Sequence, residues 1–250
     1  MGRTRFLLGL ALGAMLAGNP VWAAEQPAEP LAGTTPPMFG DWIDPDINPV
    51  TRGRIVPAIS PQSGAYKISE NESPLPQDRL FVQYNYWRRV RFGDSRLDVH
   101  REMLGVERTL LGGDLSLGLR LPFFQLNGAG ESDSGVEDLT FISKYALIKT
   151  QSGSGLSAGL AVTAPTGDGG YHIARGSTVR KIHPALIQPF MGYLWKSGDF
   201  FLHGFESVMV PTDSRDVTVF FSDIGVGYWV YRGGKESFLT GLTPTVGSCT

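Results

Sequence analysis

The sequence predicts an all-β protein, an antiparallel up-and-down transmembrane β-barrel that is incomplete at its C-terminal end. From residue 78 onward, apolar and polar residues alternate with a period of two in runs of about 8 to 13 residues. The connections between these runs are short and long in turn, which is typical of a barrel that crosses a membrane. The first 23 residues have the pattern of a secretory signal, which predicts export.

The composition supports a β-rich exported protein and excludes several other classes. The 250 residues include 32 glycines and 11% aromatic residues, and only 18% are charged, against about 25% in ordinary soluble domains. A hydrophobic content of 42% excludes a disordered chain. The net charge of −2 lacks the basic excess of a nucleic-acid-binding protein, so no nucleic-acid partner is expected. The one cysteine, Cys249, excludes an internal disulfide framework.

Residues 1–23 are expected to be a signal peptide that is cleaved on export. Arg3 and Arg5 form a basic start, Phe6–Leu16 is an apolar run, and Val21-Trp22-Ala23 ends in a small residue suited to cleavage. The apolar run has 11 residues, whereas a membrane-spanning helix needs about 20. A membrane anchor is therefore the less favoured interpretation.

Residues 24–77 are expected to be a periplasmic extension with little regular structure. Ten of the 17 prolines lie between residues 25 and 77. Each proline lacks a backbone donor and fixes φ, which disfavours helices and sheets. One short strand is predicted over Arg52–Ser60, and the barrel domain is predicted over residues 78–250.

The barrel domain is predicted to contain about nine strands. The clearest is Asp114–Leu121, in which four leucines alternate with Ser116, Gly118 and Arg120, so that one face is apolar and the other small or charged. The pattern of Leu97–Leu110 does not assign the two faces of that strand. Pro189 argues against a regular central strand over Ala185–Trp195. The other predicted strands are Arg79–Val90, Leu97–Leu110, Glu137–Ile148, Gly155–Ala164, Ala185–Trp195, Phe200–Val210, Val217–Tyr231 and Phe238–Val246.

The connections alternate in length along the chain. Short turns are predicted at Leu111–Gly113, Thr150–Ser154, Lys196–Gly198 and Arg232–Glu236. Moderate loops are predicted at Phe92–Arg96 and Pro211–Asp216, and long loops at Pro122–Val136 and Pro165–Pro184. Short periplasmic turns and longer external loops are the pattern of outer-membrane barrels, and aromatic residues near strand ends, such as Tyr84, Trp195 and Tyr228, fit their interfacial girdles.

Several of these segments carry a family resemblance. They are SPLPQDRLFVQYNYW (73–87), LGVERTLLGGDLSLGLRLPF (104–123), SGVEDLTFISKYAL (134–147) and GLAVTAPTG (159–167). Over roughly residues 73–246 the chain resembles the outer-membrane β-barrel family labelled as belonging to the MetA pathway of phenol degradation. The resemblance implies an exported barrel that acts as a transporter or channel for small molecules, aromatic ones among them, and it brings no catalytic residues.

The C-terminal end departs from a closed barrel. Nine is an odd number of strands, whereas bacterial single-chain barrels normally have an even number. The chain ends at Gly247-Ser248-Cys249-Thr250 without a further alternating strand. Unpaired backbone groups in lipid cost several kcal/mol each. We therefore expect a truncated or frame-shifted version of a longer barrel, or an edge that is completed by another element.

The polar faces of the strands predict a set of pore-lining side chains. If the leucine faces meet lipid, charged groups belong inside, because Arg or Lys at the lipid-facing midplane costs about 2–4 kcal/mol. An equally supported interpretation is that these groups pair with one another and fill a narrow barrel. The predicted residues are Gln83, Asn85, Arg120, Asp138, Lys144, Glu206 and Asp223.

Three other patterns are weaker pointers to chemistry. Gly155–Gly159 matches G-x-S-x-G around Ser157, but a nucleophile elbow needs a strand-to-helix turn and this pentapeptide lies within an alternating strand. The basic residues of the long loop after Pro165 are either a constriction or lipopolysaccharide-facing patch, or a solvated loop; they are Arg175, Arg180 and Lys181. The four histidines have no metal-ligand spacing; they are His100 and His203, expected in strands, and His172 and His183, expected in loops.

The sequence thus predicts a protein of the cell outer membrane that is not an enzyme. Its expected function is that of a channel or transporter for small molecules, including aromatic or hydrophobic ones, and its expected partners are outer-membrane lipid and a small solute. No catalytic residue, metal or cofactor is predicted. The alternative is a soluble exported β-barrel or sandwich that binds an apolar ligand inside.

Overall fold

The computed structural model describes residues 50–51, 54–55, 67–92, 95–128, 131–168, 171–175, 178–214, 218–232 and 241–249. The chain divides into two units, Met1–Pro30 and Leu31–Thr250, and the first lies outside the described residues. The predicted signal peptide (1–23) and most of the predicted extension therefore also lie outside them.

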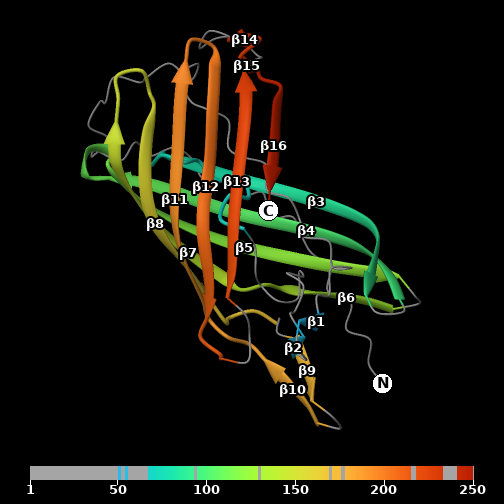
Figure 1. The fold of residues 1–250 in the computed structure, drawn as a ribbon. Coiled ribbons are helices and arrows are strands. Elements are labelled where there is room, and N and C mark those ends of the chain that lie inside the picture. The colour runs from blue at the N-terminus through green and yellow to red at the C-terminus, as the bar shows by residue number, and fades with distance from the viewer. Residues whose placement is uncertain are drawn as a thin grey trace, which may run out of the picture. The chain divides into compact units, whose positions relative to one another are not determined.

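The fold is an antiparallel up-and-down sheet, as predicted (Figure 1). The nine strands of the meander pair with their neighbours in chain order, and the sheet curves into an open half-barrel whose two edges, within the described residues, are β3 and β16. The strands are β3 (Arg79–Phe92), β4 (Ser95–Leu110), β5 (Leu115–Gly128), β7 (Leu139–Lys149), β8 (Gly155–Ala164), β11 (Leu186–Ser197), β12 (Phe200–Pro211), β13 (Val219–Tyr228) and β16 (Thr245–Cys249).

Two of the predicted long loops contain strands instead. The strand β5 continues through Pro122 to Gly128 and turns back as β6 (Glu131–Val136). Pro122 is tolerated because it sits where the partner of β5 changes from β7 to β6, so that no continuous ladder is broken there. The second long connection holds a hairpin of β9 (Tyr171–Arg175) and β10 (Thr178–Ile182).

The turns and short strands mostly follow the predicted positions. The short 3-10 turn η3 (Leu111–Gly113) links β4 to β5, and its Gly112 and Gly113 have φ of 68° and 89°, which glycine adopts without strain. Two-stranded hairpins are formed by β1 (Val50–Thr51) with β2 (Arg54–Ile55), and by β14 (Tyr231–Arg232) with β15 (Gly241–Leu242). The predicted strand Phe238–Val246 differs, since its described part divides between β15 and β16.

Pro189 does not prevent a central strand. It lies in β11, where it pairs with Leu160 of β8. On the other side, the pairing of β11 with β12 is interrupted between Ile187 and Phe190 and then resumes in the same register. The missing N–H of proline therefore costs only a local gap in one ladder.

The two faces of the sheet differ in polarity, and the apolar one is exposed. In β4, whose faces the sequence left unassigned, Leu104 and Val106 are exposed while Arg101 and Glu107 are buried. Every strand of the meander contributes to the exposed apolar face; its members include Leu80, Val82, Leu104, Val106, Leu117, Phe141, Leu160, Ile187, Met191, Phe200, Val210, Phe220, Ile224 and Val246. Within the described residues, no helix has the length and hydrophobicity to cross a membrane.

Candidate functional site

The buried face of the sheet carries charged side chains from many strands. Arg101 and Glu107 come from β4, Arg120 from β5, Lys144 from β7 and Asp223 from β13, and all five are buried. A buried charge is costly unless it is paired and hydrogen-bonded. The geometry of this face therefore depends on which groups supply the opposite charges.

Residues 67–77, which we call the inner segment, lie against this face and supply much of the opposite charge. Two backbone turns shape the segment, with the Glu70 N–H donating to the Lys67 carbonyl (3.1 Å) and the Glu72 N–H to that of Ser69 (3.2 Å). Lys67, Glu70 and Glu72 are all buried. Ile68 anchors the segment in an apolar cluster with residues of four strands, namely Ile142, Ala161, Phe190 and Phe205.

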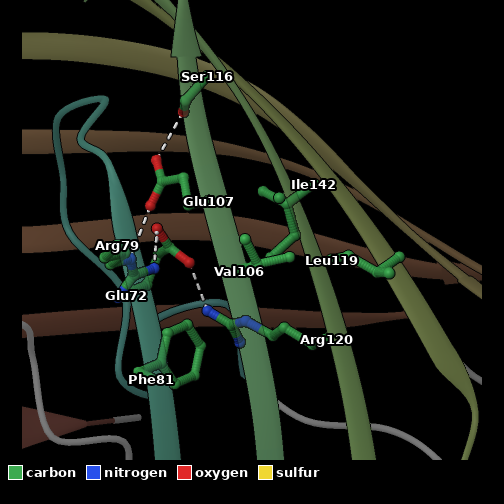
Figure 2. A pocket seen from close by; sticks show the side chains of 10 residues that line it. Glu72, Arg79, Phe81, Val106, Glu107, Ser116, Leu119, Arg120 and Ile142 are labelled. Atoms are coloured by element: carbon green, nitrogen blue, oxygen red, sulfur yellow. Dashed lines mark hydrogen bonds and ion pairs between the residues drawn. The ribbon is translucent and has the colours of Figure 1, made fainter. Parts of the chain in front are cut away.

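Glu72 is the centre of the largest ion-pair cluster (Figure 2). Its Oε1 lies 2.7 Å from an Arg79 guanidinium nitrogen and 2.7 Å from Lys144 Nζ, and its Oε2 lies 2.5 Å from Arg120. The three cations come from β3, β5 and β7, which are not all adjacent in the chain but are close in the sheet. Lys144 also donates to the Ser73 carbonyl (2.7 Å) and Arg79 to the Asn71 carbonyl, so the segment is held on both sides of Glu72.

Glu107 is the second carboxylate of this cluster. It lies 2.7 Å from Arg79 Nε and 2.9 Å from Lys144 Nζ, and it accepts a hydrogen bond from the Ser116 hydroxyl (2.6 Å). Figure 2 shows Glu107 on the side of the cluster opposite Arg120. The cluster thus contains three cations and two carboxylates.

The first residues of the inner segment bind different parts of the sheet. Lys67 pairs with Asp223 (3.1 Å), and the Ser69 hydroxyl donates to the same carboxylate (2.6 Å). Glu70 accepts hydrogen bonds from Gln83 and Asn85 (3.0 Å each). These contacts reach from β3 at one edge of the sheet to β13 near the other.

Six of the seven predicted pore-lining residues lie on the polar side. Gln83, Asn85, Arg120, Lys144 and Asp223 all contact the inner segment. Asp138 is also buried, but it binds the His183 ring (2.8 Å) and the Gly167 N–H (2.9 Å). The groups are therefore paired, and mostly with the inner segment rather than with one another.

Glu206 is the exception, and its predicted face is wrong. It pairs across the sheet with Ser222, which donates its hydroxyl to Glu206 (2.9 Å), and its neighbours Phe205 and Ser207 are buried on the polar side. Because side chains alternate along a strand, Glu206 lies on the apolar face. Both faces of β12 carry apolar residues, so the pattern of that strand did not distinguish them.

The inner segment was missed because it lies in the proline-rich stretch predicted as an extension. One signal was available: Lys67, Glu70 and Glu72 place three charges within six residues, directly before the first strand. The predicted polar side chains already included two cations and three carboxylates, so no imbalance of charge on the strands pointed to the segment.

The space beside Glu72 is small. A cavity of about 10 Å³ lies between the segment and the strands, lined by Arg79, Phe81, Arg120 and Ile142 among others (Figure 2). That volume accommodates about one water molecule.

Ser157 has a structural environment. It lies within the continuous strand β8, is fully buried, and donates its hydroxyl to the Pro74 carbonyl of the inner segment. The strand-to-helix turn of a nucleophile elbow is not the geometry of this position. Ser157 therefore helps to hold the inner segment.

The structure also places the four histidines and the basic residues of the long loop after Pro165. His100 and His203 lie in strands, and His183 lies between β10 and β11, as predicted, while His172 lies in β9 rather than in a loop. Arg175, Arg180 and Lys181 belong to β9 and β10, and their side chains lie outside the described part of the structure. Among the described residues, no group of three or more His, Cys, Asp or Glu side chains is placed to bind a metal ion.

The ionisation of Glu72 predicts a pH dependence of stability. Burial alone would raise the pKa of Glu72, but Lys144, Arg79 and Arg120 hold it well below its ordinary value of 4.5. The unfolded chain therefore binds the proton more readily than the folded chain. The contribution of Glu72 to the free energy of unfolding is complete above its unfolded pKa, and it is lost as the pH falls towards its folded pKa.

We accordingly expect the difference in unfolding free energy between the wild type and Glu72→Gln to be constant between about pH 6 and 8 and to shrink below about pH 4.5. Urea titrations of both proteins at each pH measure it. A difference that stays constant down to about pH 3 would show that the pKa of Glu72 is the same in the folded and the unfolded chain, so that the three cations do not lower it.

Comparison with known proteins does not assign the chain to a family. No protein-family model matches the chain, and no curated protein matches it.

Proposed function

We propose that the chain is an integral outer-membrane β-barrel protein that passes small solutes. One observation carries the proposal: apolar side chains are exposed on one face of all nine strands of the meander, while charged side chains of β4, β5, β7 and β13 are buried on the other. Proteins in water bury the first kind and expose the second. An apolar outer band around a polar interior is the arrangement of transmembrane barrels.

The extent of the apolar face supports a lipid environment. Leu80 is 83% exposed at one edge strand and Val246 is 80% exposed at the other, and Phe141 near the middle of the sheet is 58% exposed. Contiguous apolar patches of this kind on a folded protein mark a membrane or protein interaction surface. The predicted export signal and the predicted alternation of connection lengths agree with an outer-membrane location.

The polar interior supports passage of a solute. Its side chains carry both signs of charge and come from strands that form one wall. The family resemblance adds small aromatic or hydrophobic molecules to the proposed solutes.

Fractionation and reconstitution test the proposal. We expect the protein in the outer-membrane fraction, resistant to carbonate extraction, and we expect the folded protein to make liposomes permeable to small solutes. Recovery in the soluble periplasm would overturn the membrane location and favour the exported ligand-binding protein. A correctly inserted barrel without permeability would overturn the passage of solutes alone.

The position of Glu206 gives a separate test of the membrane location. A carboxylate on the lipid side is unfavourable, although less so than Arg or Lys, which cost about 2–4 kcal/mol at the midplane. We therefore expect Glu206→Leu to stabilise the protein in a bilayer by less than about 2 kcal/mol, as measured by urea unfolding in lipid vesicles. Asp114→Leu at an exposed turn is the control, with an expected change within about 0.5 kcal/mol. Destabilisation by Glu206→Leu would count against contact with lipid.

A further inference from the structure

The ion-pair cluster around Glu72 has an excess of positive charge on the sheet itself. Among the described residues of this cluster, Arg79, Arg120 and Lys144 contribute +3 and Glu107 contributes −1, so the strands provide +2. Glu72 reduces this to +1. A buried site with this charge requires an anion, and the anion present belongs to the chain itself.

The cations and the carboxylate are attached to the fold in different ways. The three cations project from β3, β5 and β7, whose backbones are fixed by ladders of hydrogen bonds to the neighbouring strands. Glu72 belongs to the inner segment, and each bond that the structure describes between this segment and the sheet involves a side chain. Withdrawal of the segment would therefore leave the three cations in place and one carboxylate missing.

The geometry of the position that Glu72 fills is that of a carboxylate site. One oxygen of Glu72 meets Arg79 and Lys144 and the other meets Arg120, at 2.5–2.7 Å. Guanidinium groups suit the planar carboxylate because their donors form a fixed fork. The aromatic ring of Phe81 and the side chain of Ile142 line the adjoining space, as Figure 2 shows, so an apolar group next to the carboxylate finds apolar contacts.

We propose that Arg79, Arg120 and Lys144 form a binding site for the carboxylate of a small organic acid, which Glu72 occupies while the inner segment is in place. The proposal rests on the proposed function, because it names the chemical class of the solute that passes along the polar face. A solute carboxylate and Glu72 exclude each other at the site. The solute therefore favours release of the inner segment, and the segment closes the site when the solute is absent.

Chemical rescue of Glu72→Ala tests the site. The full-length variant is refolded in detergent micelles with sodium acetate, with sodium chloride at equal ionic strength, or with acetamide, which has the shape of acetate without its charge. At an acetate concentration ten times its dissociation constant, the folding equilibrium constant is expected to rise about tenfold. Chloride and acetamide are expected to have little effect. Asp199→Ala, which removes an exposed carboxylate that pairs with Arg232, is the matched control and should not respond to acetate.

Proteolysis of the wild type provides the second arm. Lys67 is buried in the docked segment, so trypsin should cleave after it only when the segment is released. Acetate is expected to increase the rate of this cleavage relative to chloride and acetamide. If Glu72→Ala does not fold under any condition, the proteolysis of the wild type alone tests the carboxylate site.

The outcomes separate the site from the function. The carboxylate site is overturned if acetate changes the folding equilibrium of Glu72→Ala no more than acetamide and chloride do. If the variant does not fold, the site is overturned if acetate changes the cleavage rate of the wild type no more than they do. Rescue and release by acetate in a protein that fractionates as soluble would keep the carboxylate site and overturn the membrane function.

Discussion

Replacing Glu72 with alanine is expected to lower the free energy of unfolding by about 3–5 kcal/mol, the range found when one partner of a buried ion pair is removed. Glu72 is 1% exposed and is the shared partner of Arg79, Arg120 and Lys144. Without it, Glu107 would be the one carboxylate left among the described residues of a cluster of three buried cations. The cost arises mainly because these cations would stay buried without a matching negative charge, and the attraction between Glu72 and its partners is the smaller part.

Urea unfolding of the refolded protein measures this effect, with Asp199→Ala as the control. Asp199 also pairs with an arginine, at 3.0 Å, but that pair is exposed to solvent. Exposed pairs contribute about 0–1 kcal/mol, so the control should lie near the wild type. Equal losses in the two variants would show that the Glu72 cluster is solvated and would remove the physical basis for a closed inner segment.

The strand meander was predictable because its information is local. Alternation within β5, β7 and β8 assigns both faces from a few consecutive residues, and the structure has the same faces. Arg120 and Lys144 were predicted on the polar side for the same reason. The strand β12 lacked such a pattern because Phe201, Phe205 and Met209 make its inner face apolar as well, which is why Glu206 was misplaced.

The partners of the predicted polar residues were not predictable from local patterns. Glu72 and Arg120 are 48 residues apart in the chain, and Lys67 and Asp223 are 156 apart. Proline content correctly argues against regular structure in the inner segment, but irregular chain can still be fixed by side-chain contacts. The hairpin strand β6 was missed for a related reason, because its sequence ESDSGV has no apolar alternation and its pairing uses backbone groups.

Replacing Phe141 with arginine is expected to destabilise the protein in a bilayer by about 2–4 kcal/mol. Phe141 lies on the apolar face of β7, between Leu119 of β5 and Val162 of β8. An arginine there would place its charge against hydrocarbon rather than against the cations and carboxylates of the polar side. In water the same substitution would replace an exposed apolar ring by a solvated cation, with a change of about 0.5 kcal/mol or less.

The matched variant is Leu111→Arg, which introduces the same charge at an exposed turn residue of η3. Near a membrane interface the cost of arginine falls to about 0–1 kcal/mol. The destabilisation caused by the two variants should therefore differ only because the two residues lie at different depths in the bilayer. Urea unfolding and refolding in lipid vesicles measures both. A large cost for Phe141→Arg beside a small cost for Leu111→Arg requires hydrocarbon against this face. Equal small costs for both variants in lipid would mean that water or another protein covers it, because neither penalises an exposed arginine by several kcal/mol.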